Sequence, residues 1–246
     1  MRRARARAPA TLAAVLIATA IAAAIAVAMV ARGPRSPPAR AASDRPALLL
    51  LTSLPLIFPD EFGLKGGGSA ALSALETRYR VVPISAADPA ELARGGLLLM
   101  AHPPVQTADN LVALDRWVRG GGRVLLLADP MLEWPTRRAL GDPLRPSPMF
   151  MDTGLLVHWG VRLDAPDERG PAERRLAGFA ILTDSPGSLS GRCAISADAL
   201  VADCRVGKGR ATIVADADLL DPKRLGGRAG RNLDALLAEL AELERH

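Results

Sequence analysis

The order of apolar and turn-forming segments predicts an α/β protein with a mostly parallel sheet and three layers. Residues 97–101 and 123–128 are continuously apolar runs, as expected of strands that are buried on both faces. Between them, 107–119 places apolar residues on one helical face, and Thr107 is a good N-cap. A strand, a helix and a strand with short connections form a right-handed crossover, so we expect a parallel pair.

The elements before this unit continue the same alternation. We expect strands over 46–52 and 79–84, a helix over 70–77 and a helical turn over 88–93.

After the central unit the pattern becomes irregular and then changes to short β runs. We expect a short helix over 133–140, a proline-rich loop over 145–148 and a helix over 154–159. Residues 162–178 are charged, and we interpret them as a lid or an insertion. Four β runs and a closing helix follow, at 179–183, 192–196, 199–206, 210–215 and 232–243. Gly207-Lys208-Gly209 separates the last two runs and predicts a C-terminal β-hairpin.

The N-terminal part predicts a membrane anchor. Residues 11–31 carry no charge and are long enough to span a bilayer as a helix, and four arginines precede them. We therefore divide the chain into a basic cytoplasmic tail (1–10), a transmembrane helix (11–31), a linker (32–44) and an exported α/β domain (45–246). The expected location is the inner membrane, with a single span. A signal peptide cleaved after Ala26-Val27-Ala28 is the alternative, and it also exports the domain.

The charge distribution argues against a nucleic-acid partner. The formal net charge is +5, but the seven arginines before Asp44 exceed this surplus and leave −2 for the rest of the chain. A nucleic-acid-binding domain needs a basic patch of its own. The basic tail instead suits anionic lipid headgroups, so we expect the membrane as a partner.

The two cysteines, Cys193 and Cys204, both lie in the part that we expect to be exported. An even number of cysteines in an oxidising compartment predicts one disulfide. Two cysteines without a nearby histidine do not indicate a metal site, so we expect no metal there.

Four polar residues follow predicted strands and are the candidate ligand-binding residues: His102, Asp129, Asp216 and Asp218. Ligands of open α/β sheets bind at the carboxyl ends of the strands, so these side chains could hold a cation or a hydroxyl-rich ligand. The alternative for His102 is a hydrogen-bonded structural histidine. The aspartates can instead cap the turns that follow them, as the proline after Asp129 suggests.

No motif in the chain indicates a cofactor or a nucleophilic enzyme. The glycines at 66–68 lie too far from the end of the predicted strand to form a dinucleotide fingerprint. There is no phosphate-binding loop, no G-x-S-x-G elbow and no H-E-x-x-H motif. We therefore expect no cofactor.

The segments YRVVPI, GGLLLMAHPPVQTADNLVALDRWVRGGGRVLLLADP and RVGKGRATIVADADLL resemble the exported domain of gliding-motility-type ABC transporter auxiliary proteins. That domain is similar in fold to class I glutamine amidotransferases, so the resemblance implies an amidotransferase-like or flavodoxin-like sheet. It also implies a membrane-anchored, non-catalytic accessory module that works beside transporter permease and ATPase subunits.

The chain departs from the amidotransferases where their nucleophilic cysteine follows the strand equivalent to 124–128, because Asp129-Pro130 stands there. Proline has no N–H to donate to an oxyanion, so we expect no amidotransferase or hydrolase activity. The main functional hypothesis is thus an envelope accessory or binding domain, and the resemblance implies an auxiliary role in an ABC-type system. The alternatives are an exported hydrolase or saccharide-active enzyme that uses His102 and the acidic residues, and a receptor domain for a soluble ligand.

Overall fold

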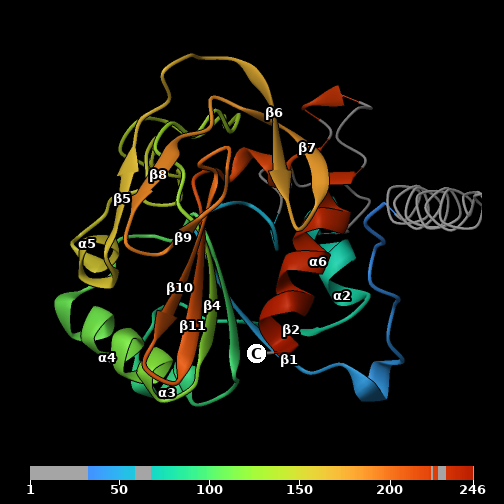
Figure 1. Cartoon of the computed structure of the whole chain (residues 1–246), viewed down its shortest axis with the longest axis vertical. Helices are drawn as coiled ribbons and strands as arrows, with labels where there is room; N and C mark the ends of the chain where they lie inside the picture. Colours follow the sequence, from blue (N-terminus) through green and yellow to red (C-terminus); the bar gives the residue numbers. More distant parts are fainter. Residues whose placement is uncertain (1–32, 59–67, 223, 227–230, 246) are drawn as a thin grey trace, which may run out of the picture. The chain divides into compact units, whose positions relative to one another are not determined.

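A seven-stranded mixed sheet lies at the centre of the unit formed by Ser36–His246 (Figure 1). The computed structural model describes residues 33–58, 68–222, 224–226 and 231–245. The strands in spatial order are β2 (Arg80–Pro83), β1 (Ala47–Thr52), β3 (Leu97–Ala101), β4 (Arg123–Leu127), β11 (Gly209–Val214), β10 (Val201–Val206) and β9 (Ala194–Ile195). The pairings from β2 to β11 are parallel, whereas β10 is antiparallel to both of its neighbours.

Two layers of helices cover this sheet (Figure 1). The helices α2 (Ala70–Glu76) and α6 (Asn232–Arg245) pack on one face, and α3 (Pro89–Leu92) and α4 (Ala108–Arg119) pack on the other. Successive side chains of a strand point to opposite faces, and the leucine-rich runs supply both cores at once. In β3, Leu97 and Leu99 belong to the α2/α6 core, whereas Leu98 and Met100 belong to the α3/α4 core. The structure also contains two short 3-10 helices, η1 (Ala42–Asp44) and η2 (Asp218–Leu220).

The strand–helix–strand unit predicted over 95–130 is confirmed. Thr107 caps α4 by accepting a hydrogen bond from the Asn110 N–H at 3.3 Å. Gly121 has a φ of 121°, which an L side chain rarely adopts, and it lets the chain turn sharply into β4. β3 and β4 then pair in parallel from Leu97↔Arg123 to Ala101↔Leu127, so their carboxyl ends lie side by side.

The segment between β4 and β9 differs from the prediction. Residues 133–140 form no helix, because Pro135 lacks the N–H that a helix would use, and 131–150 follow an irregular path. Residues 162–178, predicted as an irregular lid, instead contain strands. After α5 (Leu155–Trp159), β5 (Val161–Asp164) pairs with β8 (Ser188–Gly191), and β6 (Pro171–Leu176) pairs with β7 (Phe179–Asp184). The charged residues of β6 lie on a largely exposed hairpin, which explains why no apolar run marks this strand.

A disulfide and a buried asparagine connect β7, β9 and β10 to neighbouring elements. A disulfide joins Cys193, beside β9, to Cys204 in β10, with their Cα atoms 4.9 Å apart. Asn232, the first residue of α6, uses its side-chain amide on the backbone of β7: Oδ1 accepts from the Leu182 N–H at 3.0 Å, and Nδ2 donates to the Leu182 carbonyl at 2.6 Å. The amide also donates to the Leu219 carbonyl in η2 at 3.1 Å.

The predicted fold class and location need correction. The sheet is mixed, although mostly parallel, and two further two-stranded sheets accompany it, so an amidotransferase-like or flavodoxin-like sheet is not an adequate description. The predicted hairpin is present as β10 and β11. Among the described residues, no helix combines the length and the apolar character that crossing a membrane requires. The transmembrane helix predicted over 11–31 lies outside the described residues. The single-pass inner-membrane placement depended on that helix and is withdrawn.

Candidate functional site

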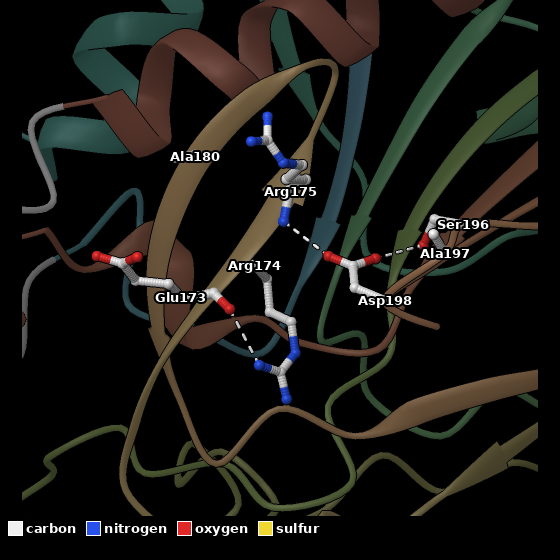
Figure 2. A pocket seen from close by; sticks show the side chains of 7 residues that line it. All are labelled: Glu173, Arg174, Arg175, Ala180, Ser196, Ala197 and Asp198. Carbon is white, nitrogen blue, oxygen red and sulfur yellow. Dashed lines mark hydrogen bonds between the residues drawn. The ribbon is translucent and has the colours of Figure 1, made fainter.

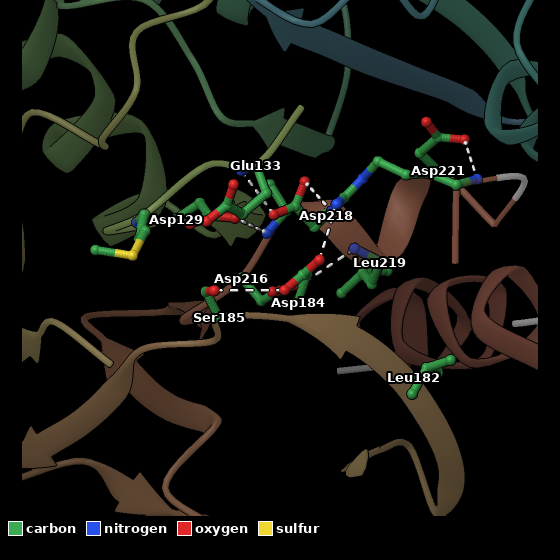
Figure 3. A network of polar contacts seen from close by, with 12 residues as sticks. Asp129, Glu133, Leu182, Asp184, Ser185, Asp216, Asp218, Leu219 and Asp221 are labelled. Atoms are coloured by element: carbon green, nitrogen blue, oxygen red, sulfur yellow. Dashed lines mark hydrogen bonds and ion pairs between the residues drawn. The ribbon is translucent and has the colours of Figure 1, made fainter. Parts of the chain in front are cut away.

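The carboxyl ends of β4 and β11 bring three aspartates together, which we call the carboxylate cluster: Asp129, Asp216 and Asp218 (Figure 3). The two strands are parallel neighbours with Leu127 opposite Val214, so Asp129 and Asp216 follow at the same level of the sheet. One carboxylate oxygen from each residue lies within 4.8 Å of the others. All three residues have an exposed fraction of 0%. The sequence prediction placed them at one sheet edge, and the structure brings them into a single group.

Backbone N–H groups hold the carboxylates in place. Asp129 accepts from the N–H of Met131 through Oδ1 and from the N–H of Ala217 through Oδ2, each at 2.8 Å. Asp218 Oδ2 accepts from the Glu133 N–H at 2.9 Å, across 85 positions of sequence. Asp129 and Asp218 thus tie together the two loops that follow β4 and β11. Asp216 Oδ1 caps the start of η2 by accepting from the Leu219 N–H at 2.9 Å.

Burial and mutual repulsion make the cluster retain protons. Loss of solvent raises the pKa of Asp129 to about 7, and the charge of Asp218 adds to this, against the backbone hydrogen bonds. Burial, with the charge of Asp129, also raises the pKa of Asp216 well above its ordinary value. Burial raises the pKa of Asp218 to about 6, although the Glu133 N–H and Arg224 oppose the shift. Near neutral pH the three carboxyl groups are therefore partly protonated and partly ionised.

Arg224 connects the cluster to the end of β7. Its guanidinium contacts Asp218 Oδ1 through Nη2 at 3.0 Å and Asp184 Oδ2 through Nη1 at 2.8 Å. The Arg224 side chain is 22% exposed, so it lies between the buried carboxylates and solvent. The sequence analysis did not predict either Arg224 or Asp184. Three acidic residues at one sheet edge need a compensating cation, but that requirement does not say which arginine supplies it.

His102 follows β3 and lies on the same edge, in a left-handed backbone conformation with a φ of 45°. It is 1% exposed, and its ring Nε2 contacts the Ser147 carbonyl at 2.9 Å. Burial lowers the pKa of His102 below its usual value, so the ring is neutral at pH 7. Among the hydrogen bonds of the described residues, those of the His102 ring lead to the loop over 131–150 rather than to the carboxylate cluster.

The cluster can support two kinds of chemistry. Carboxyl groups with pKa values near neutrality can transfer protons. The three oxygens are also close enough together to hold a hard cation.

Comparisons with known proteins give a fold likeness and no family. No family model and no curated protein matches the chain. A solved exo-β-1,4-mannosidase, Op5Man5 from Opitutaceae bacterium strain TAV5, is 15% identical over 81% of this chain and 36% of its own, with a TM-score of 0.48. A polyextremophilic β-galactosidase from Halorubrum lacusprofundi is 16% identical over 82% of this chain and 31% of its own, with a TM-score of 0.46. The cytoplasmic protein STM3548 from Salmonella typhimurium is 11% identical over 80% of this chain and 98% of its own, with a TM-score of 0.48.

These findings correct the functional expectation. This chain spans about a third of the length of the glycosidases that it matches. The named neighbours are glycosidases and a cytoplasmic protein, each with a TM-score below 0.5, so they assign no function to this chain. The non-catalytic accessory function is nevertheless withdrawn, because its exclusion of catalysis does not hold. The physical error was to exclude all catalysis because a serine or cysteine nucleophile is absent, since carboxylate chemistry needs neither. The family resemblance and the transporter partners remain untested predictions.

Proposed function

We propose that this domain is a saccharide-active hydrolase whose carboxylate cluster supplies the acid–base chemistry. The observation that carries the proposal is the geometry of three buried carboxylates within 4.8 Å at the carboxyl edge of the sheet. This edge is where open α/β sheets bind their ligands.

The protonation states suit cleavage of a glycosidic bond. Such cleavage uses one protonated carboxyl group as the acid and one ionised carboxylate as the base or nucleophile. Asp129, with a pKa of about 7, is the candidate acid. Asp218 has the lower value, about 6, and the ion pair with Arg224 favours its ionised form, so it is the candidate partner. We assign His102 no proton transfer, because its pKa is lowered and its Nε2 contacts a backbone carbonyl.

A substrate reaches these groups only after local opening. The loop over 131–150 is held to the cluster by the Met131 and Glu133 N–H groups, and its Phe150 N–H donates to the Asp129 carbonyl at 2.6 Å. Arg224 is the partly exposed group beside the cluster. Loops without regular structure that cover a site commonly open to admit substrate. In the opening step that we propose, Arg224 leaves its ion pairs with Asp184 and Asp218 and contacts the ligand instead.

The test is hydrolysis of a panel of chromogenic aryl glycosides by the full chain. We expect turnover that falls by about a hundredfold or more in Asp129→Asn and Asp218→Asn. The exposed Glu242→Gln serves as the matched control and should retain full turnover. The pH profile should follow the apparent pKa values of the cluster, near 6 and 7. Absence of turnover across the panel, or equal turnover in Asp129→Asn, would contradict the proposal.

A further inference from the structure

A hollow of about 550 Å³ lies between the β6–β7 hairpin and the turn over 196–198, away from the carboxylate cluster (Figure 2). Its lining residues are Glu173, Arg174, Arg175, Ala180, Ser196, Ala197 and Asp198. We propose that this hollow binds the oxyanion group of a small acidic ligand, and that Arg174 is the residue that recognises it. This site is independent of the proposed hydrolase activity.

The first argument is an unsatisfied donor on Arg174. Its Nη1 donates to the Glu173 carbonyl at 3.0 Å, whereas Nε is buried and has no hydrogen-bond partner in the described part of the chain. A buried donor without an acceptor costs about 1–3 kcal/mol. The Nε edge of a guanidinium offers two parallel N–H groups, which match the two oxygens of a carboxylate or a phosphate. Arg174 as a whole is only half-buried, and an oxyanion in the hollow would satisfy this edge once the side chain turns toward it.

The second argument is that both carboxylate oxygens of the nearby Asp198 already accept hydrogen bonds from groups other than Arg174. Its Oδ2 accepts from the Arg175 N–H at 2.8 Å, and its Oδ1 accepts from the Ser196 hydroxyl at 2.7 Å. Burial opposes ionisation, but these hydrogen bonds outweigh it and lower the pKa of Asp198, so the group is charged and fixed. Figure 2 shows the Asp198 oxygens directed to Arg175 and Ser196, while the Arg174 side chain extends along another part of the hollow.

The dimensions and walls define the class of ligand. Ala180 and Ala197 contribute small side chains, which leave room beside Arg174. A volume of about 550 Å³ suits a small molecule rather than a macromolecule. One guanidinium edge fits one oxyanion group, and a carboxylate-bearing small molecule and a phosphate share this chemistry.

The test is titration calorimetry of the full chain with three probes: inorganic phosphate, D-glucuronate and neutral D-glucose. We expect saturable binding of phosphate, of glucuronate or of both, and none of glucose. Binding of one anion alone identifies the ligand as phosphate-like or carboxylate-like. Arg174→Gln should weaken this binding by about tenfold or more, because it removes a charge-assisted, two-donor contact.

Arg162→Gln is the matched control, since it removes the same charge from an arginine whose side chain is 73% exposed. It should leave the affinity unchanged. Arg174→Lys keeps the charge without the two-donor edge and should bind with intermediate affinity, and it replaces the glutamine variant if that variant does not fold. No saturable binding of either anion, or equal affinity in Arg174→Gln, would overturn the proposal.

Discussion

Asp129 in the carboxylate cluster and Glu239 in α6 have similarly raised pKa values but different hydrogen-bond partners. Burial raises the pKa of both Asp129 and Glu239 to about 7, and a neighbouring carboxylate adds to each shift. Asp129 accepts two backbone hydrogen bonds that join two loops, whereas the hydrogen bond that lowers the pKa of Glu239 comes from the Thr212 side chain. A raised pKa is therefore no sufficient sign of a functional site. The contacts that the carboxyl group makes show whether the fold depends on it.

The largest expected effect is on the pH dependence of stability. An acid whose pKa is higher in the folded than in the unfolded state binds its proton more tightly when folded, so stability falls as pH rises between the two values. For Asp129, Asp218 and Glu239 this window runs from about pH 4 to about pH 7. We expect the free energy of unfolding in urea to fall on the order of 5 kcal/mol from pH 4 to pH 8.

Two kinds of groups act in the opposite direction and limit this fall. The pKa of His102 is lowered in the folded state, so its contribution increases as pH rises through its unfolded value near 6.5. Asp115 and Asp198, whose pKa values are also lowered, favour the folded state above pH 4. A stability that rises steadily from pH 4 to pH 8 would show that the buried acids do not retain protons.

Asp129→Ala tests whether the two loops depend on the hydrogen bonds that Asp129 accepts. It leaves the N–H groups of Met131 and Ala217 without acceptors, and we expect a loss of about 3 kcal/mol in the free energy of unfolding at pH 4, where the raised pKa of Asp129 adds little to the difference. Asp129→Asn retains one acceptor oxygen and should lose less. Equal stability of the alanine variant and the unchanged protein would mean that the two loops do not depend on Asp129.

Glu239→Gln should have the opposite sign. It removes the cost of ionising a buried acid, so we expect a gain of about 2 kcal/mol at pH 8 and little change at pH 4, where the acid is protonated in both states. Urea unfolding at both pH values provides the measurement. The exposed Glu76→Gln in α2 is the control and should change stability little at either pH. A gain that is the same at pH 4 and pH 8 would rule out the ionisation argument.

Arg224→Gln should give the smallest effect. Its ion pairs with Asp184 and Asp218 are partly exposed, so we expect a loss of about 1 kcal/mol at pH 8. The loss should be smaller at pH 5, where Asp218, with a pKa of about 6, is mostly protonated. The same loss at both pH values would place the effect in packing rather than in charge.

The sequence predicted the central part of the fold because that part is determined locally. The strands β1, β3 and β4 are apolar runs bounded by prolines or glycines, and α4 carries its own N-cap. Within 131–191, the helix over 154–159 and the β run over 179–183 were predicted, but the loop over 131–150 and the strand β6 were not, because distant groups determine their path. The Glu133 N–H donates to Asp218, and β6 has a partner only in β7.

The same contrast applies to the candidate site. Asp129, Asp216 and Asp218 could be grouped from the sequence because parallel strands end at a common edge. Arg224 and Asp184 could not, because Arg224 lies in a turn after η2, and Asp184 lies one residue beyond the predicted β run over 179–183, whose place in the fold the sequence did not give. Disulfide pairing was predictable from the count of two cysteines alone.

Asn232 has a consequence for the solubility of the domain. A strand at the edge of a sheet exposes N–H and C=O groups that can recruit a strand from another molecule. The Asn232 amide occupies both groups of Leu182 in the middle of β7, as a neighbouring peptide unit would. One side chain at the start of a helix thereby blocks the open edge of the β6–β7 hairpin and protects it from edge-to-edge aggregation.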